Sequence, residues 1–113
     1  MKHIESQIQQ SMIKWFRYQY PNHTIYAIPN GGRRGIIEAG IMRGEGVLSG
    51  VADIFLMHAE KGYHGLYVEV KTKEGKQSEA QKNFEVEAEK AGYRYIICRS
   101  LDDFIKETDN YLK

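Results

Sequence analysis

Two short apolar runs in the middle of the chain each contain one carboxylate. The run 51–57 (VADIFLM) is apolar except for Asp53, and the run 66–71 (LYVEVK) contains Glu69. A loop with two glycines separates them, so the two runs are predicted to form a β-hairpin. A carboxylate in an apolar strand loses its hydration, and the fold must compensate for that loss. This pattern therefore constrains both the fold and the chemistry of the region.

The alternation of side chains along a strand brings the polar groups of the hairpin together. It places Glu69 and Lys71 on one face and the intervening apolar residues on the other. Asp53 can reach the same face from the neighbouring strand. A Glu-x-Lys pair alone is explained as well by a structural ion pair, but a second carboxylate next to it favours a metal-dependent hydrolytic site.

Hydrolysis of a phosphodiester requires a group that neutralises phosphoryl charge, activates water and stabilises the leaving oxygen, and a divalent cation can do all three. Mg²⁺ prefers one or two carboxylates together with water and phosphate oxygens, which matches Asp53 and Glu69. We expect Mg²⁺ or Mn²⁺ as the cofactor, with a backbone carbonyl near Val70 as a further ligand. Lys71 is expected to orient or deprotonate the attacking water.

The remaining periodicity predicts one α/β domain over residues 1–113, with a mixed sheet of about four strands flanked by helices. The other predicted elements are a helix at 3–19, a strand at 24–28, a short helix at 34–43, a helix after Ser78, a strand at 93–98 and a helix after Ser100.

The charge of the chain argues against nucleic-acid binding by overall attraction. Its formal net charge is +1 over 113 residues, so binding to DNA would require a local basic patch. Arg33, Arg34 and Arg43 lie in the glycine-rich segment 30–50, and Lys73 follows the second apolar run. Arginines among glycines suit phosphate contacts, although a solvated loop explains them equally well.

Several other functions are excluded by missing motifs. The glycine-rich segment has neither the GxGxxG spacing nor the lysine of a nucleotide-binding loop. The four histidines lack metal-binding spacing, the one cysteine cannot build a zinc site, and no serine lies in a GxSxG motif. No apolar run approaches the roughly 20 residues of a membrane span. A cytoplasmic protein without a membrane partner is expected.

Two further polar residues each have a structural explanation. Glu5 would lie in the first turn of the helix at 3–19, where the helix dipole favours a carboxylate. Ser78 and Gln81 have the spacing of a capping box, in which the glutamine reaches back to the start of its helix.

The motifs PNGG (29–32), GVADIF (50–55), GLYVEVKTKEGK (65–76), SEAQ (78–81) and GY (92–93) together resemble a VRR-NUC domain. This is the virus-type replication-repair nuclease branch of the PD-(D/E)XK superfamily. The resemblance extends from Glu5 to about Phe104. It implies a metal-dependent DNA endonuclease on a restriction-endonuclease-like αβββαβ core.

The resemblance also implies roles for individual residues. Asp53 and Glu69 would be metal ligands and Lys71 the catalytic lysine, while Glu5 would complete or support the metal site. Gln81 would contact the site or the substrate. The residues Asn30, Gly31 and Gly32 match the segment that lies beside the active site in the family. Ala52 stands where the family usually has proline, a residue that the chemistry does not require.

Stand-alone domains of this kind resemble Holliday-junction resolvases, which implies a homodimer that cuts branched DNA and suggests a phage or bacterial source. Two alternatives remain open. One is a less selective nuclease that acts on flaps, single strands or duplex DNA. The other is a catalytically silent DNA-binding domain with the same fold.

Overall fold

The computed structural model describes residues 3–29 and 36–113. Its elements in chain order are α1 (His3–Gln19), β1 (Ile25–Ala27), α2 (Ile36–Gly44), β2 (Ile54–Leu56), β3 (Leu66–Val70), α3 (Glu79–Lys90), β4 (Arg94–Cys98) and α4 (Leu101–Leu112). The predicted order of helices and strands is confirmed. Helix α1 has the predicted bounds, and α3 and α4 begin directly after their predicted caps, Ser78 and Ser100.

The four strands form one mixed sheet in the order β1-β2-β3-β4. Strand β2 pairs antiparallel with both β1 and β3, so β1 and β3 run in the same direction. Strand β4 pairs parallel with β3 after the crossover through α3. As a result, the end of β1, the start of β2 and the end of β3 lie at the same edge of the sheet.

The two hairpin strands are shorter than predicted. Pairing between them ends at Ile54 and Val68, so Asp53 precedes β2 and Lys71 follows β3. Beyond the last pair, the main-chain N–H of Val70 donates to Oδ2 of Asp53 at 2.7 Å. At this position a side-chain oxygen, and not a main-chain carbonyl, accepts the hydrogen bond from a strand amide. Periodicity alone does not predict this.

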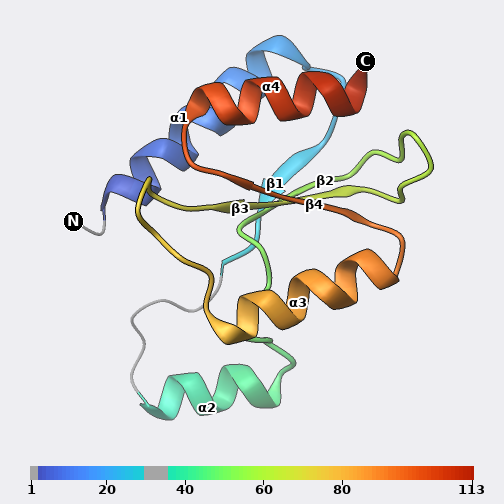
Figure 1. Ribbon diagram of the computed structural model, residues 1–113. Helices are drawn as coiled ribbons and strands as arrows, with labels where there is room; N and C mark the ends of the chain where they lie inside the picture. The colour runs from blue at the N-terminus through green and yellow to red at the C-terminus, as the bar shows by residue number, and fades with distance from the viewer. Residues whose placement is uncertain (1–2, 30–35) are drawn as a thin grey trace.

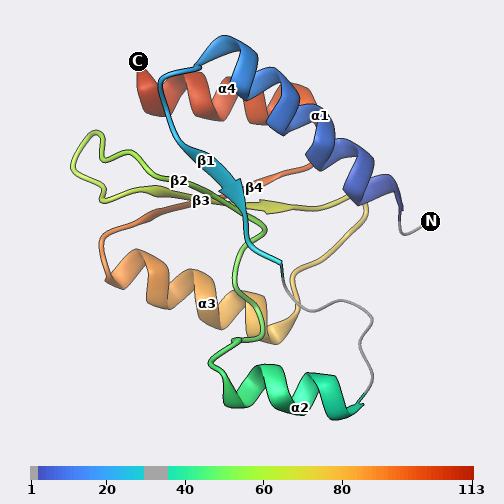
Figure 2. The same cartoon turned by 180° about the vertical axis from the view of Figure 1, so that it is seen from behind.

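Helices cover both faces of the sheet. Figures 1 and 2 show α1 and α4 together on one face and α3 on the other, with α2 beyond α3. The main core lies between the sheet and the α1–α4 layer. Its fully buried side chains include Met12, Phe16, Ile54, Leu56, Leu66, Val68 and Phe104. Each contributes about 1.5–3 kcal/mol to folding. Within the described residues, no helix is long and apolar enough to cross a membrane.

The face of the sheet beneath α3 is aromatic. Phe55 and Tyr67 lie with ring centroids 4.7 Å apart, and Tyr67 contacts Phe84 of α3 at 5.0 Å. Tyr95 packs next to Phe84. Glu69 lies on this same face as Tyr67, so its carboxylate is enclosed between the sheet and α3.

Candidate active site

Asp53 is held by its main chain and its side chain. Its carbonyl accepts the N–H of Ile28 at 2.8 Å, and its own N–H donates to the carbonyl of Val68 at 3.1 Å. Together with the bond from the Val70 amide, these contacts tie the residue to the neighbouring strand β3 and to the end of β1. The carboxylate is therefore fixed at the edge where the three strands end. The Val70 amide is directed at this group. The Val70 carbonyl as a metal ligand stays a prediction.

Glu69 is buried, with 1% of its surface exposed. Its Oε2 accepts a hydrogen bond from Nε2 of Gln81 at 2.9 Å, and its Oε1 accepts one from the Tyr95 hydroxyl at 3.2 Å. Burial raises the pKa of Glu69 to about 8, and the negative charge of Asp53 adds to this rise. Lys71 and the Tyr95 hydrogen bond act in the opposite direction but do not cancel it. Burial and the neighbouring carboxylate therefore both favour the protonated form of Glu69.

Gln81 serves the helix and the carboxylate at the same time. Its Oε1 accepts the N–H of Ser78 at 2.8 Å while its own N–H donates to Oγ of Ser78, which confirms the predicted capping box. Its Nε2 is then free to donate to Glu69. The two ends of one amide connect the start of α3 to the candidate site. A role for Gln81 toward the substrate stays a prediction.

Lys71 follows β3 on the face that carries Glu69, as predicted. Its N–H donates to the carbonyl of Cys98 at 3.1 Å, which extends the main-chain pairing with β4 by one residue. Its positive charge lowers the pKa of Glu69, so the two side chains interact across the site. Among the described residues, no carboxylate lies within ion-pairing distance of its ammonium group. The ammonium is thus available for a further partner.

Arg99 fixes the loop that follows Lys71. Its Nη1 donates to the carbonyls of Thr72 and Gly75, each at 2.7 Å, and more weakly to that of Lys73 at 3.3 Å. Sequence analysis did not identify this residue, because the contact depends on the parallel pairing of β3 with β4. No local motif connects Arg99 to the loop.

Tyr95 was also missed, and it belongs to a second layer of polar contacts behind Glu69. Gln77 donates to Oε1 of Glu85 at 2.9 Å and to the Tyr95 hydroxyl at 3.2 Å. Burial, reinforced by the charge of Glu69, raises the pKa of Tyr95, so its hydroxyl remains a donor. Strand alternation could have placed Tyr95 on the α3 face, but no motif in the sequence singles out this tyrosine.

The other predicted site residues lie on the surface or outside the described residues. Glu5 is exposed in the first turn of α1. In the part of the chain that the structure describes, no three or more His, Cys, Asp or Glu side chains are arranged to hold a metal ion. A supporting role for Glu5 stays a prediction. Arg43 is exposed on the last turn of α2, and Lys73 is exposed in the loop after β3. The predicted residues Asn30, Gly31, Gly32, Arg33 and Arg34 lie outside the described residues.

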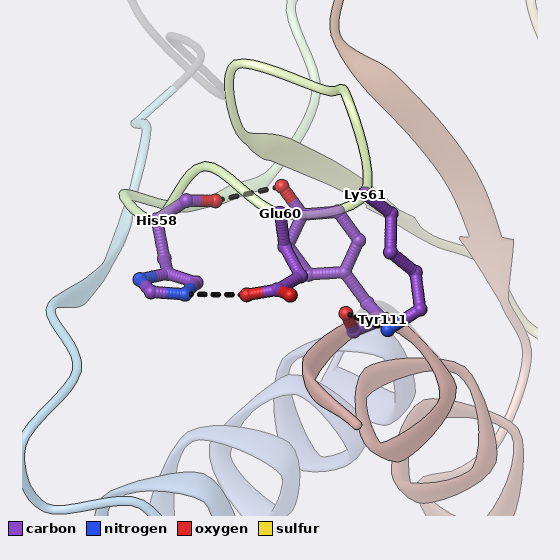
Figure 3. Close-up of polar contacts among 4 residues, drawn as sticks. All are labelled: His58, Glu60, Lys61 and Tyr111. Carbon is purple, nitrogen blue, oxygen red and sulfur yellow. Dashed lines mark hydrogen bonds and ion pairs between the residues drawn. The ribbon is translucent and has the colours of Figure 1, made fainter.

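A second polar cluster lies at the far end of the β2–β3 connection and is structural (Figure 3). His58 and Glu60 contact each other at 3.0 Å, and the Tyr111 hydroxyl donates to the His58 carbonyl at 2.6 Å. The ammonium of Lys61 donates to the carbonyl of Tyr111 at 3.0 Å. These bonds attach the connection to the last turn of α4. The cluster therefore explains the histidine at position 58 without a catalytic role.

The carboxylate pair fits a divalent cation. Asp53 and Glu69 offer hard oxygen donors, and Mg²⁺ commonly uses one or two protein carboxylates. Burial and the charge of Asp53 raise the pKa of Glu69, and a bound cation would offset the repulsion between the two carboxylates. By contrast, burial raises the pKa of the Cys98 thiol to about 12, so the cysteine is a core residue and not a nucleophile.

Comparison with known proteins identifies the class. The VRR-NUC domain model matches residues 4–102, so the chain belongs to the VRR-NUC family. A solved structure described as a "VRR_NUC domain protein" superposes with a TM-score of 0.80 at 24% sequence identity, covering 96% of this chain and 87% of that chain. No curated protein matches. The resemblance and the fold inferred from the sequence are confirmed. Family membership implies a nuclease domain with DNA as its partner.

Proposed function

We propose that this chain is a Mg²⁺- or Mn²⁺-dependent endodeoxyribonuclease that cuts branched DNA as a Holliday-junction resolvase. The observation that carries the proposal is the convergence of Asp53 and Glu69 at one edge of a VRR-NUC fold, with Glu69 buried and its pKa raised. A buried carboxylate next to a second one costs stability. A catalytically silent domain would have no use for that cost.

In this mechanism Asp53 and Glu69 would hold the metal, with Glu69 deprotonated. A bound divalent cation would neutralise charge on the phosphoryl oxygens and lower the pKa of coordinated water. The protein prepares the two ligands in advance: the Val70 amide orients Asp53, while Gln81 and Tyr95 each donate to one oxygen of Glu69. Glu5, in the first turn of α1, is proposed to support the site from outside this pair.

Lys71 acts on the reacting atoms. Its ammonium, which no described carboxylate pairs with, donates to the attacking water or to a phosphoryl oxygen, where negative charge develops in the transition state. Arg99 positions the loop that follows Lys71 and so limits where its side chain can reach. The exposed cations Arg43 and Lys73 contact DNA phosphates. Arg33 and Arg34 of the glycine-rich segment are proposed to do the same.

A homodimer suits a branched substrate, because a two-fold junction needs two cuts and an isologous dimer presents two equivalent sites. The exposed apolar side chains around α2 support association with a second copy. Ile37 is 79% and Ile41 56% exposed, and Leu48 after the helix is exposed as well. Figure 1 shows α2 standing apart from the sheet beyond α3, where a second chain has access to it.

The test is cleavage of labelled four-way junction, flap, single-stranded and linear duplex DNA, each with Mg²⁺, Mn²⁺ or EDTA. Paired symmetric nicks in the junction, lost in EDTA, are expected from a dimer of twice the mass of the chain. Cutting spread evenly over flaps, single strands and duplex would discard the resolvase and keep the less selective nuclease. Tight junction binding without cutting in either metal would indicate the silent DNA-binding domain.

A further inference from the structure

Tyr26 is an aromatic residue whose exposure the fold does not explain. It lies on edge strand β1 opposite Phe55 of β2, and their rings contact each other at 5.8 Å. Phe55 then continues the aromatic row to Tyr67 beneath α3. The inner rings of this row are half-buried, whereas Tyr26 at its outer end is 43% exposed. The outermost ring of the row is therefore partly accessible to solvent.

The exposed ring lies close to the candidate catalytic edge. Asp53 directly precedes β2 and lies two residues before Phe55, and side chains two apart along extended chain share a face. With about 3.3 Å per residue along a strand and about 4.8 Å between strands, the main chains of Tyr26 and Asp53 are separated by about 8 Å. A DNA strand that is cut beside Asp53 therefore passes close to Tyr26.

A groove of about 930 Å³ runs along α1 beside the same edge strand. Its lining includes Ala27 of β1 and, on α1, the donors Gln9, Gln10, Lys14 and Arg17. One Arg17 amino group donates to the Ile25 carbonyl at 3.0 Å, which fixes the guanidinium against β1. Amide and cationic donors in a row suit the phosphates and sugars of a nucleic-acid strand. The first turn of α1, with Glu5, forms one end of this groove.

We propose that the β1 edge binds an unpaired DNA strand next to the cleavage site. A base stacks on Tyr26 on the α3 face of the sheet, and the sugar–phosphate chain passes round the edge strand to Lys14 in the groove on the α1 face. Stacking requires a base that is exposed on its face, which a continuous duplex does not offer. The edge therefore selects DNA with unpaired or splayed nucleotides, such as a branch point. This inference rests on the proposed nuclease function and assigns the feature of DNA that the nuclease recognises.

The test is fluorescence anisotropy in EDTA with a labelled single strand and a labelled linear duplex. Tyr26→Ala is expected to weaken single-strand binding by about 5- to 100-fold, in line with aromatic stacking on one base, and to leave duplex binding unchanged. Tyr26→Phe keeps the ring and should bind as wild type. Lys14→Ala should make the slope of log affinity against log salt shallower by about 0.7 for the single strand. Tyr63→Ala, at a tyrosine of similar exposure (38%) at the far end of the β2–β3 connection, is the matched control.

The results that would overturn the strand-binding inference differ from those that would refute the proposed nuclease function. Single-strand binding by Tyr26→Ala equal to that of wild type, or equal losses for single strand and duplex, would overturn the inference while metal-dependent cleavage by wild type still upheld the nuclease. Absence of cleavage by wild type in both metals would refute the nuclease. Loss of single-strand binding in Tyr26→Ala alone would then still establish the strand-binding edge.

Discussion

The buried carboxyl of Glu69 predicts that the metal-free protein loses stability as the pH rises, and that Glu69→Gln removes this loss. In the folded chain, burial and Asp53 raise the pKa of Glu69 from its ordinary value of 4.5 to about 8. The folded state therefore keeps a proton that the unfolded state has already released. The contribution of Glu69 to the free energy of unfolding is therefore complete below about pH 4.5 and declines as the pH rises to about 8.

The size of the effect follows from the two pKa values. Each unit of difference corresponds to about 1.4 kcal/mol, so the ionisation of Glu69 removes about 4 kcal/mol between about pH 5 and pH 9. Glutamine has nearly the same shape and no charge to desolvate. Its oxygen can still accept from Gln81, whereas its amide nitrogen faces the Tyr95 hydroxyl, whose O–H then loses its acceptor. That loss lowers the stability of the variant equally at every pH, so the pH dependence of the difference from wild type is the quantity to measure.

Urea unfolding in EDTA at several values of pH measures this difference. As the pH rises, the stability of Glu69→Gln should increase relative to that of wild type by several kcal/mol of unfolding free energy. Other titrating groups cancel in this comparison. Addition of Mn²⁺ should stabilise wild type most at high pH and leave Glu69→Gln nearly unchanged. A difference between the two proteins that stays constant from about pH 5 to pH 9 would refute the assigned environment of Glu69.

Two further predictions concern residues that position the site. Gln81→Ala and Ser78→Ala should each cost about 0.5–2 kcal/mol of unfolding free energy through the lost cap. Only Gln81→Ala also removes the hydrogen bond to Glu69, so only this variant should slow junction cleavage. Equal cleavage by the two variants would contradict this. Arg99→Ala should release the loop after Lys71, with a stability cost of about 1–3 kcal/mol and reduced cleavage. Arg94→Ala, at the start of β4, should leave cleavage intact. Unchanged cleavage by Arg99→Ala would show that the loop needs no such support.

Much of the fold could be predicted from local patterns. The helical spacing of α1 and the two serine caps depend on neighbouring residues, so they were predicted correctly. The strand ends were predicted less well, because Asp53 uses its side chain to bind a strand amide, and strand periodicity contains no information on that choice. Tyr111 of α4 was not predicted as a core residue either, because its burial depends on contact with the distant β2–β3 connection.

In the candidate site, too, features that depend on neighbouring residues were predicted and those that depend on distant contacts were not. Alternation within β3 and pairing with β2 predicted that Asp53 and Glu69 share a face. The capping box of Ser78 and Gln81 predicted where α3 begins. Tyr95 and Arg99 reach the site only because β4 lies parallel to β3 in a particular register, which single-sequence periodicity does not determine. Glu5 remains a predicted supporting residue whose place in the site depends on a bound metal.

The most direct test of the account compares junction cleavage by wild type, Asp53→Asn and Lys71→Ala in Mg²⁺ or Mn²⁺, with junction binding measured in EDTA. Asparagine can still accept the Val70 amide, so Asp53→Asn removes the charge while preserving the local fold. The account predicts metal-dependent cleavage by wild type, its loss in both variants, and junction binding by all three proteins. Cleavage by both variants at the wild-type rate would show that the carboxylate pair and its lysine are not the catalytic site.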